Sequence, residues 1–195
     1  MPYSNALASC NAAINMTGNN MVDFGFIQMA LTSVSDILPW CGPDRAIYRN
    51  FITCAVNAYR ACGTASIKKL VAEADEFAEA FDYICNGMND LDTSCVNVRQ
   101  IMTCTEGKLN SKNFTSPPQR NATYEMLRPF YCGYVNYLEE CIMLDTTLRN
   151  CTPKVRTKEI YVAALSEIKP DECGAMSVVY TSLLLAVSLL LNYIL

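Results

Sequence analysis

The chain has 195 residues, which suit one domain of ordinary size or two small ones. Its formal net charge is −4, which disfavours nucleic acid and anionic membrane surfaces as partners, since both attract basic proteins. It contains no histidine, and this excludes Ser-His-Asp and Cys-His catalytic sites.

Apolar residues recur at three- and four-residue spacing in the first half, and this pattern predicts helices. The three predicted helices cover residues 22–38, 42–63 and 64–86. Pro39 should end the first, while Pro43 and Gly63 mark the start and the end of the second. The third has the most regular apolar pattern and is predicted as one helix, with Thr64 or Ser66 as its N-terminal cap.

Three more helices are predicted in the second half. They cover residues 96–104, 123–144 and 156–169, with a polar loop over 107–122. Pro129 and Gly133 should bend or break the long helix near its first third. No run alternates as a strand would, so the predicted fold class is all-α, a disulfide-rich bundle of five to six helices followed by a C-terminal hydrophobic tail.

Cysteine usage is the strongest compositional signal. The eleven cysteines are Cys10, Cys41, Cys54, Cys62, Cys85, Cys95, Cys104, Cys132, Cys141, Cys151 and Cys173. They are scattered without a C-x-x-C pair, which argues against zinc and favours disulfides in an oxidising, extracellular compartment. The sequence leaves their pairing open, with one cysteine unmatched inside the chain.

The cysteine spacing also contains a weak internal echo. The matched sets are Cys54, Cys62 and Cys85 in the first half and Cys141, Cys151 and Cys173 in the second. This spacing raises the hypothesis of two related helical hairpins stapled across their ends. By the same analogy, Cys173 forms a bridge as Cys85 does.

Four N-glycosylation sequons agree with an extracellular location. Their acceptors are Asn15, Asn113, Asn121 and Asn150. Asn113 and Asn121 are favoured because they flank a polar stretch, whereas a bridged Cys151 could block Asn150. Residues 1–20 lack a secretory signal, so we expect the start of the chain to be truncated and the signal peptide to be missing.

The chain ends on 22 uncharged residues, 174–195, after an extracellular Cys-rich domain over 1–173. As a helix, this segment would extend about 33 Å, which is enough to cross a bilayer. Small residues, a short spacer and a terminal apolar run fit a GPI-attachment signal, with attachment at Gly174 or Cys173. A single-pass transmembrane helix and an apolar helix packed on the domain remain alternatives.

Catalysis is not expected. The carboxylate groups at 73–76, 139–140 and 171–172 are interpreted as solvated helix faces, and no sequence motif indicates a metal or a cofactor. Arg128, Tyr134 and Tyr137 are the partner-binding candidates, because Tyr and Arg are favoured at interface hot spots.

The predicted function is recognition at the outer face of the plasma membrane, as a receptor, co-receptor or adhesion-type protein with a protein partner. A carrier of a small apolar ligand and a protective coat protein are the alternatives. A large apolar cavity would favour the carrier. A solid core with an exposed Tyr/Arg patch would favour the receptor, and carboxylates gathered in a cleft would favour an enzyme.

Overall fold

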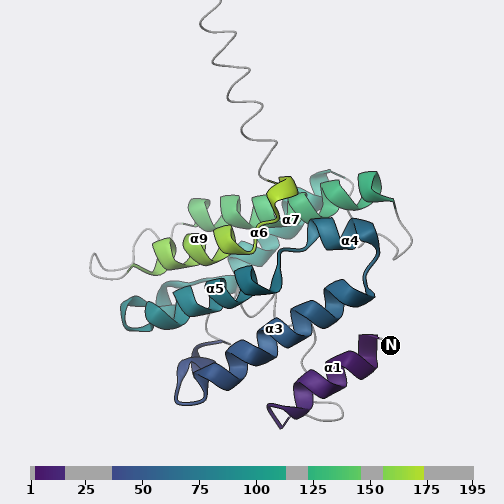
Figure 1. Cartoon of the computed structure of the whole chain (residues 1–195). Helices are drawn as coiled ribbons and strands as arrows, with labels where there is room; N and C mark the ends of the chain where they lie inside the picture. The colour runs from purple at the N-terminus through teal and green to yellow at the C-terminus, as the bar shows by residue number, and fades with distance from the viewer. Residues whose placement is uncertain (1–2, 16–36, 113–122, 146–155, 174–195) are drawn as a thin grey trace, which may run out of the picture.

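The computed structural model describes residues 3–15, 37–112, 123–145 and 156–173 (Figure 1). Every regular element within these ranges is helical and none is a strand, which confirms the predicted all-α class. The α-helices are α1 (Tyr3–Ala12), α3 (Arg45–Cys62), α4 (Ala65–Leu70), α5 (Ala74–Asn86), α6 (Val98–Ser111), α7 (Tyr124–Leu144) and α9 (Thr157–Glu167). Three short 3-10 helices accompany them: η2 (Leu38–Cys41), η3 (Met88–Asp90) and η4 (Thr93–Cys95).

The described residues thus hold seven α-helices, against the five to six predicted. Three differences account for this: α1 is an additional helix, the predicted third helix is divided into α4 and α5, and the predicted first helix is not among the described ones. The predicted helix over 22–38 falls mostly outside the described residues. Only its last two positions are described, and these are Ile37 and Leu38, the first residue of η2.

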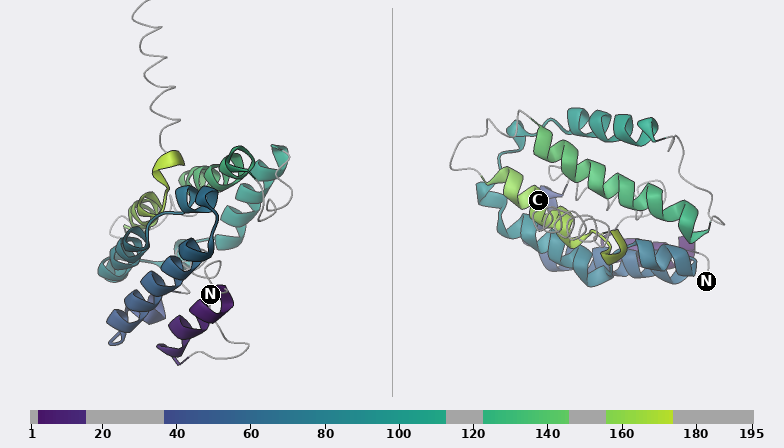
Figure 2. Two further views of the ribbon diagram at one scale, coloured as in Figure 1. Left: turned by 45° about the vertical axis from the view of Figure 1, so that its right-hand side comes forward. Right: turned by 90° about the horizontal axis from the view of Figure 1, so that it is seen from above.

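The longer helices lie side by side in the order α1, α3, α5, α9, α7 and α6 (Figures 1 and 2). One apolar core runs through this stack, because each helix turns a buried stripe towards its neighbours. Its largest fully buried side chains include Phe51, Phe77, Phe81, Leu138 and Tyr161.

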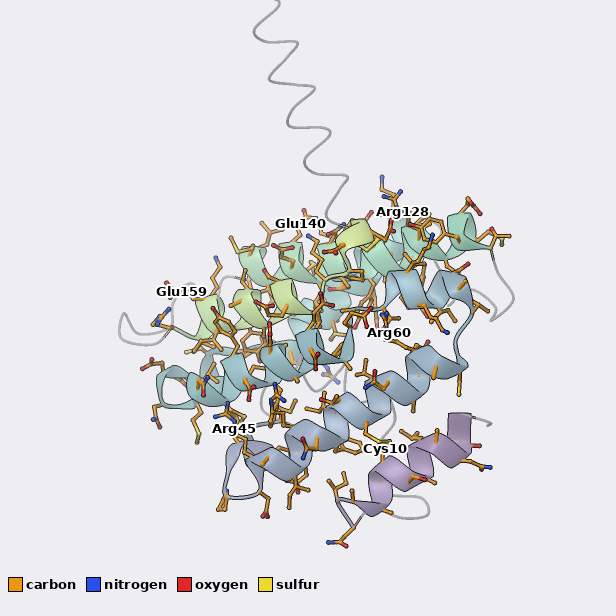
Figure 3. The ribbon with its side chains drawn as sticks, in the orientation of Figure 1. Cys10, Arg45, Arg60, Arg128, Glu140 and Glu159 are labelled. Carbon is orange, nitrogen blue, oxygen red and sulfur yellow. A yellow bond between two sulfur atoms is a disulfide. The ribbon has the colours of Figure 1, made fainter. Side chains whose placement is uncertain are left out.

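Helix α3 begins at Arg45, two residues after Pro43, and ends before Gly63 as predicted. Its first turns are tied to α5 through a single carboxylate. Asp82 accepts from Arg45 Nη2 and from Arg49 Nε, each at 2.7 Å, and Figure 3 shows Arg45 reaching towards α5. These pairs fix the angle between two neighbouring helices of the stack.

The prediction of one helix over 64–86 is wrong. The chain is extended at Val71 (φ −121°, ψ 124°), and this separates α4 from α5. The Arg60 guanidinium, from the end of α3, donates to the carbonyl oxygens of Val71 and Ala72 and pairs with Glu73. A side chain from another helix therefore satisfies carbonyls that would otherwise continue the helical ladder.

Local capping also supports the break. The Thr64 side chain accepts from the Ile67 backbone N–H at 3.3 Å, so Thr64 is the cap of α4, one of the two predicted candidates. Glu73 and Glu76 form a reciprocal capping box at the start of α5. Each short helix then buries its own apolar residues, including Leu70 from α4 and Phe77 from α5.

Helix α6 extends to Ser111, so the predicted loop begins five residues later than expected. The extension packs on α7: Leu109 is buried, and Lys108 Nζ bonds to Glu140 Oε1 at 2.7 Å. The sequence signal for a loop was mainly polarity, which an exposed helix face shares.

Helix α7 matches its predicted range and continues as one helix through Pro129 and Gly133. Of the two predicted effects of these residues, a break does not occur, and a bend stays a prediction. Pro129 has no N–H to donate to the carbonyl of Glu125, one turn earlier on an exposed residue. Helix α9 agrees with the prediction over 156–169.

Four disulfides stabilise the stack. They are Cys10–Cys54, Cys41–Cys85, Cys104–Cys141 and Cys132–Cys173, with sequence separations of 44, 44, 37 and 41 residues. Loops of this length correspond to a stabilisation of about 4 kcal/mol per bridge in the chain-entropy model. Cys62 and Cys95 lie outside these four bridges, and Cys151 lies outside the described residues.

Candidate binding cleft

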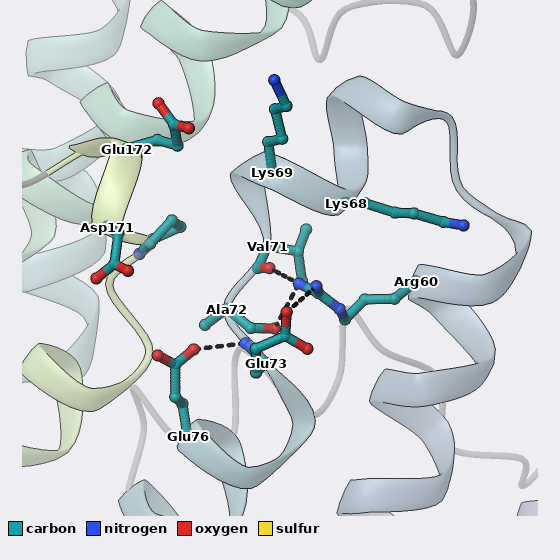
Figure 4. A pocket seen from close by; sticks show the side chains of 10 residues that line it. Arg60, Lys68, Lys69, Val71, Ala72, Glu73, Glu76, Asp171 and Glu172 are labelled. Atoms are coloured by element: carbon teal, nitrogen blue, oxygen red, sulfur yellow. Dashed lines mark hydrogen bonds and ion pairs between the residues drawn. The ribbon is translucent and has the colours of Figure 1, made fainter.

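A cleft of about 390 Å³ opens between the end of α3, the α4–α5 junction and the turn that follows α9 (Figure 4). Its lining residues are Arg60, Lys68, Lys69, Val71, Ala72, Glu73, Glu76, Pro170, Asp171 and Glu172. Seven of these ten carry a charge, and both signs are present. The cleft therefore has the character of a polar recognition site rather than of an apolar pocket.

The floor of the cleft is built from the break between α4 and α5. Arg60 covers the carbonyls of Val71 and Ala72 and pairs with Glu73, so this arginine and this glutamate neutralise each other. The Arg60 side chain is only 16% exposed, whereas that of Glu73 is 66% exposed. The pair is thus part of the scaffold, and the charges left to meet a ligand lie on the walls.

One wall is acidic. Glu76, in the first turn of α5, accepts a hydrogen bond from the Glu73 backbone N–H. Asp171, on the turn that follows α9, lies on the same side of the cleft as Glu76 (Figure 4). Burial raises the pKa of Glu76, and the charges of Asp171 and Glu73 raise it further, against the lowering effect of that hydrogen bond. Two ionised carboxylates that repel each other in this way would be stabilised by a positively charged group between them.

The other rim is basic, and it is linked to the acidic wall through α7. Lys68 and Lys69 form the last turn of α4, and Lys69 Nζ lies 5.8 Å from the centroid of the Tyr124 ring. Tyr124 Oη in turn donates to Glu172 Oε2 at 2.8 Å. In Figure 4 the two lysines lie across the cleft from Glu76, and the Tyr124 ring lies beside Lys69.

The turn that carries Asp171 is held in place by three contacts. Arg128 Nη2, from α7, donates to the carbonyl oxygen of Glu172 at 3.0 Å. The backbone N–H of Cys173 bonds to the carbonyl of Pro170 at 2.8 Å, and the bridge to Cys132 ties the same turn covalently to α7. These contacts fix the position of the acidic wall.

The three predicted binding residues lie in different environments in the structure. Arg128 is not among the residues that line the cleft, but its contact with the Glu172 carbonyl holds the turn that follows α9. Tyr134 is half-buried, and its pKa is raised first by burial and then by the charge of Glu106 on α6. Tyr137 is half-buried against Gly133. Their role in partner binding stays a prediction.

Two acidic groups that the sequence interpretation kept apart meet at this cleft, namely those at 73–76 and at 171–172. Three of their carboxylates already have structural partners, since Glu73 pairs with Arg60, Glu76 caps α5 and Glu172 accepts from Tyr124. The third group, Glu139 and Glu140, lies elsewhere and pairs with Lys169 and Lys108. No pattern of spacing in the chain marks the cleft. The nearest signal is Glu76 three residues after Glu73, a capping-box spacing that has glutamate where serine or threonine is usual.

Below the cleft lies an apolar hollow of about 10 Å³, lined by Leu70, Val71, Ala72, Phe77, Tyr131, Val135, Ile168 and Pro170. This is room for about one water molecule, so the hollow provides no site for a carried apolar ligand.

Of the predicted sugar acceptors, Asn15 follows α1 and is exposed, with φ at 57°. Asn113, Asn121 and Asn150 lie outside the described residues, as does the whole tail over 174–195 with its predicted attachment residue Gly174. Cys173, the alternative attachment residue, is bridged to Cys132.

Among the described residues, no group of three or more Asp, Glu, Cys or His side chains is arranged to hold a metal ion. None of the helices within the described ranges has both the length and the apolar character needed to span a membrane. Comparison with protein-family models, with curated proteins and with solved structures found no match. The chain is thus defined by its own features, as a disulfide-rich helical protein compatible with an extracellular domain.

Proposed function

We propose that the chain is a cell-surface, disulfide-stabilised glycoprotein ectodomain that acts in recognition, as a receptor, co-receptor or adhesion-type protein. The observation that carries this proposal is the set of four disulfides, because such bridges form and persist in oxidising compartments. In this proposal residues 1–173 lie outside the cell and 174–195 supply a GPI-attachment signal, or alternatively a single transmembrane span.

The cleft is the proposed partner-binding surface. Lys68 and Lys69 on one side and Glu76 and Asp171 on the other suit a protein segment that presents both an acidic and a basic side chain. Complementary charges of this kind govern specificity and association rate more than affinity. The carrier alternative gains no support from the small apolar hollow, and a coat protein without a ligand would have no use for a formed cleft.

The location is tested on cells. The full chain is expressed behind a borrowed signal peptide, and the surface is treated with a phosphatidylinositol-specific phospholipase C. Release supports the lipid anchor, and surface protein that resists release indicates a transmembrane span. Protein that stays inside the cell would overturn the extracellular proposal.

The binding surface is tested with protein released from those cells and assembled into fluorescent tetramers that stain a panel of intact cell types. Asp171→Lys and Lys69→Glu should each reduce staining at least ten-fold, and raised salt should weaken staining by the parent. Lys112→Glu, an exposed position at the end of α6, is the matched control for charge reversal and should stain as the parent does. Equal staining by all three variants would remove the cleft from the proposal.

A further inference from the structure

The cysteines pair in the same order in both halves of the chain. The bridges are Cys10–Cys54 and Cys41–Cys85 in the first half, and Cys104–Cys141 and Cys132–Cys173 in the second. Among the four bridged cysteines of each half, the first pairs with the third and the second with the fourth. None of these four bridges joins the two halves.

Four cysteines can pair in three ways, so the shared order alone is weak support for a repeat. The helices provide an independent observation, because they repeat the same plan. An outer helix is bridged to a middle helix in both halves, α1 to α3 and α6 to α7. The last helix of each half packs on the middle one, α5 on α3 and α9 on α7.

The stack therefore has the same arrangement from either end, with α5 and α9 in contact at its centre (Figures 1 and 2). The halves differ in one respect within this plan. In the first half η2 and α3 are separated at Gly42 and Pro43, whereas α7 runs through the corresponding stretch as one helix although it contains Pro129 and Gly133.

We infer that the chain consists of two copies of one helical unit with four bridged cysteines, and that the α5–α9 contact, together with the packing of α4 on α7, is the surface through which one copy binds the other. The α5–α9 part of this surface corresponds to a two-fold dimer interface in which both partners use the same element. The inference is independent of the proposed function, since it concerns how the body of the protein is assembled.

The contact between the copies is close. Gly87 follows α5 and lies against Ile160 of α9, so that a Cβ at this position would be 2.5 Å from Ile160 Cδ1. The joint between the halves adds two hydrogen bonds to the start of α9. The backbone N–H of Asp92 donates to Thr157 Oγ1 at 2.9 Å, and that of Arg156 donates to the carbonyl of Asp90 at 3.0 Å.

The test cuts the backbone between the two copies and leaves the contact between them in place. A protease site is inserted after the exposed Ser94 of the full chain, in a background where Cys62, Cys95 and Cys151 are replaced by Ser. The protein is purified in a mild detergent, cleaved, and followed by analytical ultracentrifugation at a series of concentrations. A non-reducing denaturing gel of the same sample reports whether any bridge among the eight remaining cysteines joins the halves.

On the gel we expect two separate fragments, each with two bridges. In the centrifuge we expect one undissociated species at micromolar concentration, which separates reversibly on dilution. Fragments that stay covalently joined on the gel would overturn the inference. So would fragments that are already separate at micromolar concentration.

Substitutions at the contact provide a second measurement. Gly87→Ala should weaken association of the cleaved halves by up to about ten-fold, because the buried Ile160 side chain must shift to make room for the new methyl group. The same change in an Ile160→Val background should have a smaller effect, since valine lacks the Cδ1 atom that lies nearest. Gly107→Ala on α6, where a Cβ meets nothing within 4 Å, is the matched control and should leave association unchanged.

Circular dichroism of each uncleaved variant shows that the helices still form, so that weak association is not mistaken for unfolding. Equal association of the Gly87→Ala, Gly107→Ala and parent proteins would show that the copies do not bind through the α5–α9 contact.

Discussion

Among the ion pairs of the described residues, we expect the loss of Arg60 to destabilise the domain most. This arginine donates hydrogen bonds to backbone carbonyls in addition to pairing with a carboxylate. It donates to the carbonyls of Val71 and Ala72, both in buried residues, and pairs with Glu73. Without it the chain must either leave these carbonyls short of a partner or draw water into the junction.

The magnitude follows from these contacts. A buried carbonyl that loses its partner costs about 1–3 kcal/mol. The ion pair with Glu73 contributes only about 0.2–1 kcal/mol, since the Glu73 side chain is 66% exposed. We therefore expect Arg60→Ala to lower the free energy of unfolding by about 2–4 kcal/mol, and Glu73→Gln to lower it by less than about 1 kcal/mol.

The assay is urea denaturation of the oxidised protein, followed by circular dichroism, with Arg60→Lys as an intermediate variant. Lysine keeps the charge but cannot span two carbonyls and a carboxylate as the planar guanidinium does. If Arg60→Ala and Glu73→Gln lower the stability by equal, small amounts, the carbonyl contacts do not stabilise the break as argued.

Two further predictions concern other contacts between helices. Burial raises the pKa of Asp82, but hydrogen bonds and charge from Arg49 and Arg45 outweigh it and hold that pKa below its usual 3.8. Its contribution is therefore fully present above about pH 4 and is lost as the pH falls through the folded value. Asp82→Asn should lower the free energy of unfolding by about 1 kcal/mol at pH 7. The difference in urea midpoint between this variant and the parent should become smaller below pH 4. A difference that stays constant down to pH 2 would contradict the prediction. Replacing Cys132 and Cys173 together by Ser should lower stability by about 2–5 kcal/mol and speed amide exchange in the C-terminal turn, whereas unchanged exchange there would show that the bridge does not hold it.

The candidate site was only partly accessible from the sequence. The residue types favoured at interfaces pointed to Arg128, Tyr134 and Tyr137, yet the two tyrosines are half-buried and the arginine holds a neighbouring turn. The cleft instead brings Arg60 and Asp171 together, and no local pattern relates positions so far apart in the chain.

The sequence by itself determined the all-α class, the approximate ranges of α3, α7 and α9, and the disulfide-rich character. Apolar spacing, helix ends and cysteine content are local or compositional, so they can be recognised without knowing the fold. Only the tertiary structure decided where the helix over 64–86 breaks, how the cysteines pair and which charges meet. Each of these depends on contacts between distant segments, as when Arg60 of α3 satisfies the carbonyls that separate α4 from α5.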